Sequence, residues 1–404
     1  MSKQTVLFIS PSEFCHNPRI LKASDAFYNE GYGVVVWEII QGSAEPSLNQ
    51  KVKGNRPYIF HSFDISKRNA KSYIEWLLAS LTQKLALMLW RFFHSESFLF
   101  KYTRLKGLLG FKCHDKYDFI YINVVDALPF AIYLSRKTGT KVIFDSQEYF
   151  KGQYENDDYH TRQWVEFAER ENLYKSYIVI GTTNALINQL KKEYPAHQRW
   201  VRVRNLPFNP VEISTEIKSK NLHRLELVWH GYAIHYGSRG VNIILEAVCQ
   251  CDFDIHISLM GKISTNERKI ISDFMQSKGH LNRLKFIPPA HPEHIVEALI
   301  NYDIGIIGEL PLNENQKLTS SNKLFEYLHA GLAVVTSDMP GILETINDEK
   351  CGLVYSAGNV EDLYNKLLKL HTDRSLFNFF RENSRNFAMD NNWQKDFNLV
   401  IAQI

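Results

Sequence analysis

The residues most suited to chemistry are Lys323 and Glu326, three positions apart at the start of a short predicted helix, SSNKLFEYLHAG (320–331). The serine pair is a suitable N-cap and the final glycine a suitable C-terminal residue, so we predict about nine helical residues between them. Free N–H groups and the helix dipole favour an anion at such a terminus, and Lys323 adds a charge. A carboxylate one turn into the helix can accept hydrogen bonds from hydroxyls beside a phosphate. The pattern fits a sugar nucleotide, and an exposed Lys–Glu pair worth at most about 0.5 kcal/mol explains it equally well.

The composition indicates an ordinary globular protein with more than one core. The chain has 404 residues, of which 45% are apolar and 23% charged, and a net charge of +3. We therefore expect two domains of roughly 150–200 residues each, and the net charge does not indicate nucleic-acid binding. The five cysteines are scattered, which favours reduced thiols over zinc or disulfides. With no signal peptide and no uncharged apolar run of roughly 18 residues, we expect a cytoplasmic protein, peripheral on the inner face of a membrane at most.

Apolar runs that end in Gly, Ser, Asp or Asn alternate with helical patterns, which is typical of parallel sheets covered on both faces. The strand candidates of the first half are 5–10, 32–39, 119–123, 141–146, 177–183 and 200–205. Those of the second half are 225–231, 255–261, 283–289, 304–309, 333–338 and 351–356. Each half is therefore predicted to be a doubly wound α/β unit, with a ligand cleft at the carboxyl ends of the strands.

The domain boundaries follow from this pattern. Residues 1–205 are predicted to form the N-terminal domain and residues 225–385 the C-terminal domain. The linker is placed at 206–224, which contains two prolines and has no clear periodicity. The tail, 386–404, is predicted to be a helix that returns to the N-terminal domain.

Residues 61–116 interrupt the alternation, because they contain many aromatic residues and no clear strand. Nine Lys or Arg residues stand against three acidic residues in 61–112. Basic residues interleaved with Trp, Phe and Leu on helices suit an anionic membrane surface or a lipid-linked ligand. The alternative is a pair of core-packed helices with solvated basic faces.

The segment around Lys323 and Glu326 is specific enough to compare with known families. It continues as SSNKLFEYLHAGLAVVTSDMPGILETI, which resembles the nucleotide-binding segment of glycosyltransferase family 4, in the subgroup with an N-K-x-F-E-Y motif. The positions in register are Asn322, Lys323, Phe325, Glu326, Tyr327, Ala330, Gly331, Asp338, Gly341 and Glu344. The resemblance implies a retaining enzyme with the GT-B fold, two Rossmann-like domains with a cleft between them. It implies that 1–205 is the acceptor-binding domain and 225–385 the nucleotide-sugar-binding domain. It also implies that Glu326 holds the ribose hydroxyls of a nucleoside-diphosphate sugar.

The resemblance extends through the N-terminal half at lower specificity. CHNPRILKASDAFYNEGYGVVV is similar to the family's opening motif, which places Asn17 and Arg19 on the acceptor side of the cleft. YDFIYINVVDALPFAIYLSRKTGTKVIFDSQEYF looks like the segment whose cleft positions are Asp126 and Glu148 here. Asp126 and Glu148 are therefore candidates for orienting the acceptor hydroxyl or accepting its proton.

In the second half, LVWHGYAIHYGSRGVNIILEAV resembles the segment in which a basic residue before glycine, here Arg239, reaches the diphosphate. A guanidinium suits this role because it can form paired hydrogen bonds with phosphate oxygens, which makes Arg239 a catalytic candidate. The resemblance implies a donor site made of Gly231, Arg239, Asn322, Lys323, Leu324 and Glu326. His230 and His235 flank this loop and are further candidates for donor contacts.

Three positions depart from the family pattern. The family carries a second glutamate eight positions before the one matched by Glu326, and Leu318 occupies that position here. Glu314, Asn315, Gln316 and Lys317 are polar neighbours that could substitute. Tyr232 replaces an arginine, and Gln147 replaces a histidine.

The sequence predicts neither a metal nor a bound cofactor. Asp252 and Asp254 spell D-x-D, a metal motif in another glycosyltransferase fold, but they precede a buried strand and are predicted to form a turn. We expect transfer of a hexose or N-acetylhexosamine from a nucleoside-diphosphate sugar to a glycan or lipid-linked oligosaccharide in surface polysaccharide biosynthesis. The alternatives are a sugar-nucleotide epimerase or hydrolase of the same fold, or a catalytically silent nucleotide-sugar-binding protein.

Overall fold

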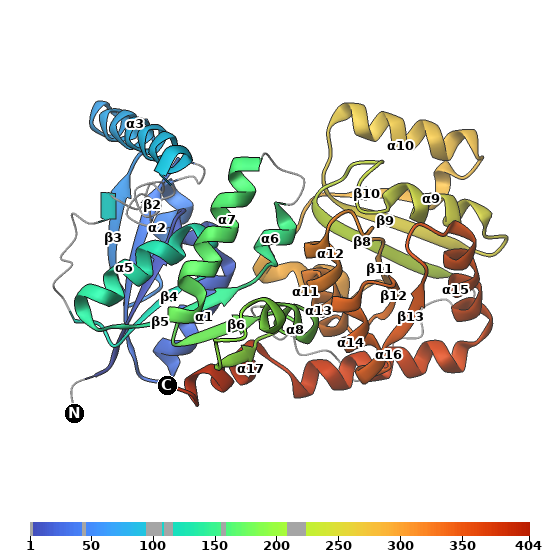
Figure 1. Ribbon diagram of the computed structural model, residues 1–404. Coiled ribbons are helices and arrows are strands. Elements are labelled where there is room, and N and C mark those ends of the chain that lie inside the picture. The colour runs from blue at the N-terminus through green and yellow to red at the C-terminus, as the bar shows by residue number, and fades with distance from the viewer. Residues whose placement is uncertain (1–2, 43–45, 94–106, 109–115, 155–158, 208–223) are drawn as a thin grey trace. The chain divides into compact units, whose positions relative to one another are not determined.

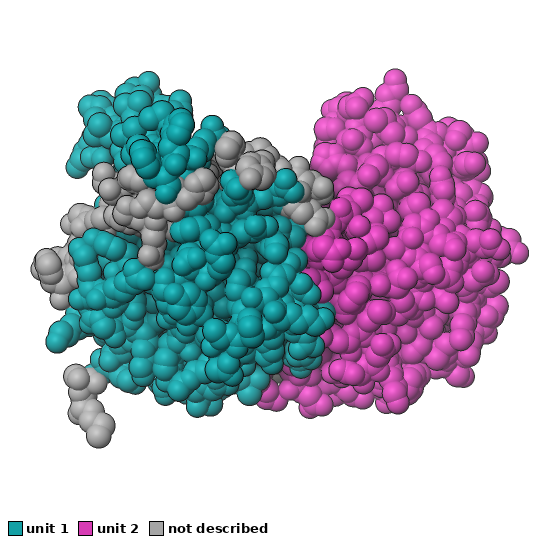
Figure 2. All heavy atoms as spheres, viewed as in Figure 1, with its two compact units in different colours: residues 1–203, 396–404 teal, residues 204–395 magenta. Residues whose placement is uncertain are grey.

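Figure 1 shows the computed structural model, which describes residues 3–42, 46–93, 107–108, 116–154, 159–207 and 224–404. The chain divides into two units (Figure 2): unit 1 contains residues 1–203 and 396–404, and unit 2 contains residues 204–395. Each unit is built around one parallel β-sheet. The predicted fold class, two Rossmann-like α/β domains, is confirmed, and the cleft expected between them stays a prediction.

The sheet of unit 1 has, within the described residues, seven parallel strands in the order β3-β2-β1-β4-β5-β6-β7. The strands are β1 Thr5–Ser10, β2 Gly33–Ile40, β3 Ile59–Asp64, β4 Phe119–Ile122, β5 Lys141–Ser146, β6 Ile178–Gly181 and β7 Trp200–Arg202. The strand order reverses between β1 and β4. Doubly wound sheets bind ligands beside the carboxyl ends of the strands at such a reversal.

Helices cover both faces of this sheet. They are α1 Pro18–Asn29, α2 Pro46–Gly54, α3 Ala70–Phe93, α5 Leu128–Thr138, α6 Phe150–Gln153, α7 Tyr159–Asn172, α8 Asn184–Glu193 and α17 Trp393–Ile401, with 3-10 turns η1 Phe14–His16, η3 Val125–Ala127 and η4 Leu173–Lys175. Trp90 of α3, Phe130 of α5 and Trp164 of α7 belong to the core on one face. On the other face, Phe27 of α1 packs against Phe8 and Phe397 of α17, with ring centroids 5.9 and 5.4 Å away.

The sheet of unit 2 has six parallel strands among the described residues, in the order β10-β9-β8-β11-β12-β13. The strands are β8 Leu225–Ala233, β9 Ile255–Lys262, β10 Leu284–Ile287, β11 Ile304–Ile307, β12 Ala333–Ser337 and β13 Gly352–Tyr355. The helices are α9 Val241–Gln250, α10 Thr265–Ser277, α11 Ile295–Leu299, α12 Glu314–Leu318, α13 Asn322–His329, α14 Pro340–Glu349, α15 Val360–Thr372 and α16 Arg374–Asp390, with turns η5 Leu281–Arg283 and η6 Pro292–His294. The order reverses between β8 and β11.

Alternate residues of the unit 2 strands face two separate cores. Leu227 and Trp229 pack with α9, α10 and α15 on one face. Val228 packs with α11, α13 and α14 on the other. The short helix predicted from the SSNKLFEYLHAG segment therefore lies on the sheet beside the β8–β11 reversal, as α13 (Figure 1).

Every predicted strand is present. The sequence did not predict β3, which extends to Asp64, so the expectation of no strand in 61–116 was wrong for its first residues. The residues of β3 are exposed or half-buried at the sheet edge, because an edge strand needs no continuous apolar run. The segment then continues as α3, while 94–106 and 109–115 lie outside the described residues. Most of the predicted linker, 208–223, also lies outside them.

The C-terminal tail differs in detail from the single helix predicted at 386–404. Helix α16 continues to Asp390, and a separate helix, α17, begins at Trp393. Residues 396–404 belong to unit 1, where Phe397 is fully buried between Phe27 and Tyr121.

We predict that Phe397→Ala lowers the free energy of unfolding of unit 1 by about 3–5 kcal/mol, because it leaves a cavity between buried rings. The matched control is Leu399→Ala on the same helix, where the leucine is 54% exposed. We expect the control to change stability by no more than about 0.5 kcal/mol. Urea unfolding of both variants measures the difference, and equal losses would contradict the packing role of α17.

Candidate functional site

Helix α13 presents its amino end beside the carboxyl end of β11. Leu324, Phe325 and Leu328 are buried on its core face, and Gly331 ends it in the left-handed region with φ of 68°. Ser321 is the N-cap residue, but its side chain makes no cap hydrogen bond. The amino end of the helix is therefore available to an anion in the way the sequence predicts.

Lys323 does not form the exposed pair with Glu326 that the sequence allowed. The lysine is only 3% exposed, and its Nζ lies 2.7 Å from Oε1 of Glu309, the residue at the end of the apolar run before α12. Burial lowers the pKa of the Lys323 ammonium below its ordinary value, and the nearby Glu309 carboxylate partly offsets that effect. The Lys323 Nζ also lies 5.3 Å from the centroid of the Trp229 ring, which adds a cation–π contact.

Arg239 approaches the same carboxylate from the loop after β8. Its Nη1 lies 3.9 Å from Oε1 of Glu309, so one carboxylate faces two cations. The Glu309 backbone is held in place because Ser337 Oγ donates a hydrogen bond of 2.7 Å to its carbonyl oxygen. Sequence analysis did not single out Glu309, although an acid that directly follows a buried strand is a usable signal.

The backbone at Arg239 is positioned by close contact with a neighbouring loop. Arg239 and Gly240 both have positive φ, 50° and 69°, and for a residue with a side chain this conformation is uncommon. A Cβ on Gly240 would lie 2.0 Å from the carbonyl oxygen of Gly308. Only glycine therefore fits at 240, and the turn it permits directs the Arg239 guanidinium toward Glu309.

Glu326 pairs with a histidine from the neighbouring strand. Its Oε2 lies 3.0 Å from Nε2 of His230. The His230 backbone N–H donates to the buried Tyr327 hydroxyl, which lies within hydrogen-bond distance of the Val228 and Ile306 carbonyl oxygens. The Glu326 carboxylate is thus held one helical turn from the amino end of α13.

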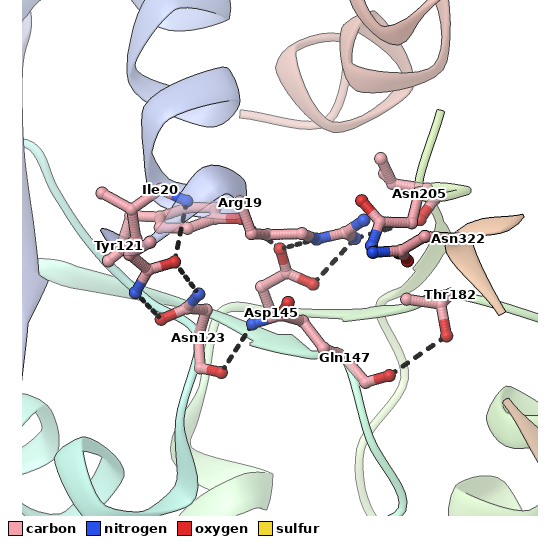
Figure 3. Close-up of polar contacts among 11 residues, drawn as sticks. Arg19, Ile20, Tyr121, Asn123, Asp145, Gln147, Thr182, Asn205 and Asn322 are labelled. Atoms are coloured by element: carbon pink, nitrogen blue, oxygen red, sulfur yellow. Dashed lines mark hydrogen bonds and ion pairs between the residues drawn. The ribbon is translucent and has the colours of Figure 1, made fainter. Parts of the chain in front are cut away.

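The remaining donor candidates occupy different surroundings. Asn322 is exposed, and its Oδ1 accepts a hydrogen bond of 2.5 Å from Nδ2 of Asn205 (Figure 3). The Leu324 side chain is fully buried and is therefore not accessible to a sugar nucleotide. The Leu324 N–H donates a hydrogen bond to the Ser321 carbonyl. Gly231 lies beside Trp229, and a Cβ there would come within 2.8 Å of the indole.

The polar residues expected to substitute for the missing glutamate are engaged locally. Glu314 pairs with Lys317 at 2.5 Å, and Gln316 accepts a hydrogen bond from the Leu312 N–H. The backbone of Leu318 lies where α14 approaches, because a Cβ on Gly341 would be 2.5 Å from the Leu318 carbonyl oxygen. The Leu318 side chain is half-buried at the end of α12.

Arg19 was predicted to lie on the acceptor side of the cleft, but its side chain is buried inside unit 1. Its Nε and Nη2 donate to the two carboxylate oxygens of Asp145 at 2.7 and 2.9 Å (Figure 3). Nη2 also donates to the Val203 carbonyl. The Tyr121 hydroxyl donates to the same carboxylate. Arg19 and Asp145 are 2% and 0% exposed, so this ion pair ties α1 to β5.

The other unit 1 candidates lie at the carboxyl ends of β1, β4 and β5. Asn17 is the N-cap of α1, and its side-chain amide exchanges hydrogen bonds of 3.2 and 2.8 Å with the buried Asn123. Gln147 donates to the Asn123 carbonyl. Asp126 has exposed surface, yet desolvation by the surrounding protein raises the pKa of its carboxyl. Glu148 is half-buried in the turn after β5.

The structure thus brings together Arg239, Lys323 and Glu326, with Glu309 and His230, in unit 2. It brings Asn17 close to Asn123 in unit 1. No group of three or more His, Cys, Asp and Glu residues in the described part of the chain could hold a metal ion, and the expected absence of a cofactor stays a prediction. The D-x-D residues lie in the turn before β9, at the amino edge of the sheet.

The unit 2 sequence matches a known family. Residues 225–373 match the family described as "Glycosyl transferases group 1". The similarity to this family covers part of unit 2 only. This range holds every candidate donor residue named above.

Solved structures of other proteins share the fold of the whole chain. Sucrose-phosphate synthase from Thermosynechococcus elongatus is 13% identical with a TM-score of 0.71, and a glycosyltransferase from Rickettsia africae is 14% identical with a TM-score of 0.65. HepE from Anabaena, solved with UDP and glucose, is 14% identical with a TM-score of 0.65. Each alignment covers 99% of this chain and 98% of the other. The fold is therefore GT-B. A comparison of the sequence with curated proteins gives no match.

We predict that Asp145→Asn lowers the free energy of unfolding of unit 1 by about 3–5 kcal/mol, because it leaves the buried Arg19 charge uncompensated. The double variant Arg19→Met with Asp145→Leu should lose clearly less, since neither charge is then buried. Urea unfolding compares them. A loss below about 1 kcal/mol for the single variant would show that the pair is not the structural tie inferred from its burial.

Proposed function

We propose that the chain is a retaining glycosyltransferase that moves a hexose or N-acetylhexosamine from a nucleoside-diphosphate sugar to a glycan or lipid-linked oligosaccharide. The observation that carries the proposal is the pairing of Lys323 and Arg239 around Glu309 at the amino end of α13. Two cations and a helix terminus at one point form a site for a group with two negative charges, and a diphosphate is such a group.

The rate enhancement is proposed to come from stabilising the leaving diphosphate. Negative charge develops on the diphosphate as the bond to the sugar breaks, and positive groups already in place stabilise it without reorganising. Glu309 keeps both cations directed at one point before the donor binds. The reaction as proposed requires no metal ion, because Arg239, Lys323 and the helix dipole supply the positive charge.

Glu326 is proposed to bind the ribose of the donor. Its carboxylate stands one turn into the helix, beside the proposed phosphate position, with Nε2 of His230 3.0 Å from its Oε2. A carboxylate oxygen can accept hydrogen bonds from two neighbouring hydroxyls, as the ribose diol provides. In unit 1, Asp126 and Glu148 are proposed to orient the acceptor hydroxyl or accept its proton, and the raised pKa of the Asp126 carboxyl brings it closer to the range of a general base.

We predict that Glu326→Ala weakens the binding of nucleoside-diphosphate sugar about tenfold to a hundredfold. This range corresponds to the loss of hydrogen bonds to a charged group, which contribute about 1.5–3 kcal/mol. A thermal-shift screen of UDP, GDP and their sugars first identifies the nucleotide, and calorimetry then measures the affinity. Glu297→Ala is the matched control, because Glu297 is an exposed acid of α11 whose ion-pair partner, His294, lies three positions before it. Unchanged donor binding in Glu326→Ala would refute the ribose contact.

We further predict that affinity for the nucleotide falls with rising pH, and that the fall begins below the ordinary lysine pKa of 10.5. The pKa of Lys323 is lowered in the free protein, and a bound diphosphate would raise it. Binding therefore takes up a proton once the pH exceeds the lowered value, and affinity declines from there. Lys323→Met should bind weakly at neutral pH and lose this dependence, as calorimetry at a series of pH values would show. The same alkaline slope in the variant would contradict the assignment.

The acceptor dependence of turnover separates the proposal from its alternatives. A transferase consumes the sugar nucleotide faster when an acceptor glycan is present. An epimerase or hydrolase consumes it equally well without acceptor. A catalytically silent binder, for which Leu318 at the family's glutamate position is the supporting observation, would bind the nucleotide and not consume it.

A further inference from the structure

Helix α3 is apolar on two opposite faces, and among the described residues only one of these faces packs against the core of unit 1. Trp76, Ala79, Leu87 and Trp90 pack against the core of unit 1. At 24 residues, α3 is a long helix that stands at the edge of the unit beside β3 (Figure 1). The core-facing residues explain why α3 is held on the unit, but they do not explain the composition of its other face.

The outward face of α3 is a continuous apolar stripe. Its residues recur three or four positions apart, which places them on one side of a helix. They are Ile74, Leu77, Leu78, Leu81, Leu85, Met88 and Phe92, with exposed fractions of 55, 38, 56, 63, 52, 49 and 74%. Single exposed apolar residues are normal, but a stripe of this length marks a surface that another phase or molecule covers.

Exposed basic residues border the stripe. On a helical projection Lys84 and Arg91 fall on one edge and Lys71 on the other, and all three are exposed. Glu75 is the only acidic residue of α3. An anionic lipid surface complements both features, because the acyl region accepts the apolar stripe and the headgroups attract the basic edges.

The same charges disfavour pairing with a second copy of the chain. Two α3 helices joined through their stripes would bring like charges close together around the contact. Among the described residues, no helix is long and apolar enough to cross a membrane, so α3 would lie along the surface.

We propose that α3 docks unit 1 onto a membrane that contains anionic lipid, with the stripe from Ile74 to Phe92 in the interface. The sequence left membrane contact of 61–112 as one of two interpretations, and the present proposal concerns one face of α3 only. Docking does not depend on the glycosyltransferase assignment. The corollary that the acceptor is lipid-linked does rest on the proposed function.

The test is co-sedimentation of the full chain with phosphatidylcholine vesicles, with and without phosphatidylglycerol. Leu81→Gln with Leu85→Gln removes two stripe residues of 63% and 52% exposure without introducing a poor helix former. The control is Leu312→Gln with Leu399→Gln, which alters two leucines of 64% and 54% exposure elsewhere. We expect the wild type and the control to bind anionic vesicles, and the α3 variant to partition at least tenfold less.

Lys84→Gln with Arg91→Gln should reduce partitioning by more than tenfold at low salt, since each basic residue near an anionic surface contributes about fivefold. Raising the salt concentration should weaken wild-type binding and have little effect on this variant. No binding of the wild type, or equal binding of the Leu81/Leu85 variant, would overturn the proposal. So would a wild-type dimer in sedimentation velocity that the Leu81/Leu85 variant abolishes.

Nucleotide binding of each variant is measured in parallel by thermal shift. If the α3 variants bind nucleotide as the wild type does but lose vesicle binding, docking and donor recognition are separate properties. If vesicle binding is intact and no nucleotide binds, the proposed function fails while the docking proposal stands.

Discussion

A lysine ammonium removed from water keeps its charge only if a carboxylate stands beside it, and this constraint organises the end of β11. Lys323 is almost completely buried, so Glu309 must be present at hydrogen-bond distance. Glu309 in turn brings Arg239 near the same point. The arrangement leaves an excess of positive charge beside an uncapped helix terminus, which is the electrostatic requirement for holding a diphosphate.

The backbone supports this cluster by close packing at glycine positions. Gly240 lies against the Gly308 carbonyl, and Gly305 leaves room for the Tyr327 ring, since a Cβ there would come within 2.2 Å of it. Tyr327 then positions the strand that carries His230. The charged groups are thus held by neighbouring strands and loops at the β8–β11 reversal, where parallel sheets place their ligand-binding residues.

Unit 1 uses its strand ends differently. Arg19 and Asp145 neutralise each other inside the protein, and their exposed fractions leave no surface for a ligand. At this edge Asn17, Gln147 and Glu148 are half-buried, and Asp126 has exposed surface. Sequence similarity predicted that Arg19 and Asn17 both lie on the acceptor side. A sequence motif does not show which of its polar residues forms a buried ion pair, so the burial of Arg19 could not be predicted.

Periodicity alone was sufficient for most of the fold. The apolar runs of β1, β5 and β12 are long and continuous, because central parallel strands are buried on both faces. The edge strand β3 lacked that signal and was missed. For α3, the sequence showed a high content of apolar residues. It did not show that these residues form two opposite faces of which one packs against the core, because composition does not tell which side of a helix the core covers.

The sequence by itself determined the two α/β units, the position of α13, and the presence of a lysine and a glutamate in its first turn, because local periodicity and capping act between near neighbours in the chain. The tertiary structure decided the partners of those residues. Glu309 lies 14 positions before Lys323, and His230 lies 96 positions before Glu326, so no local pattern connects either pair. The pairs form because neighbouring strands in a parallel sheet bring their carboxyl ends to one edge, whatever their separation in the sequence.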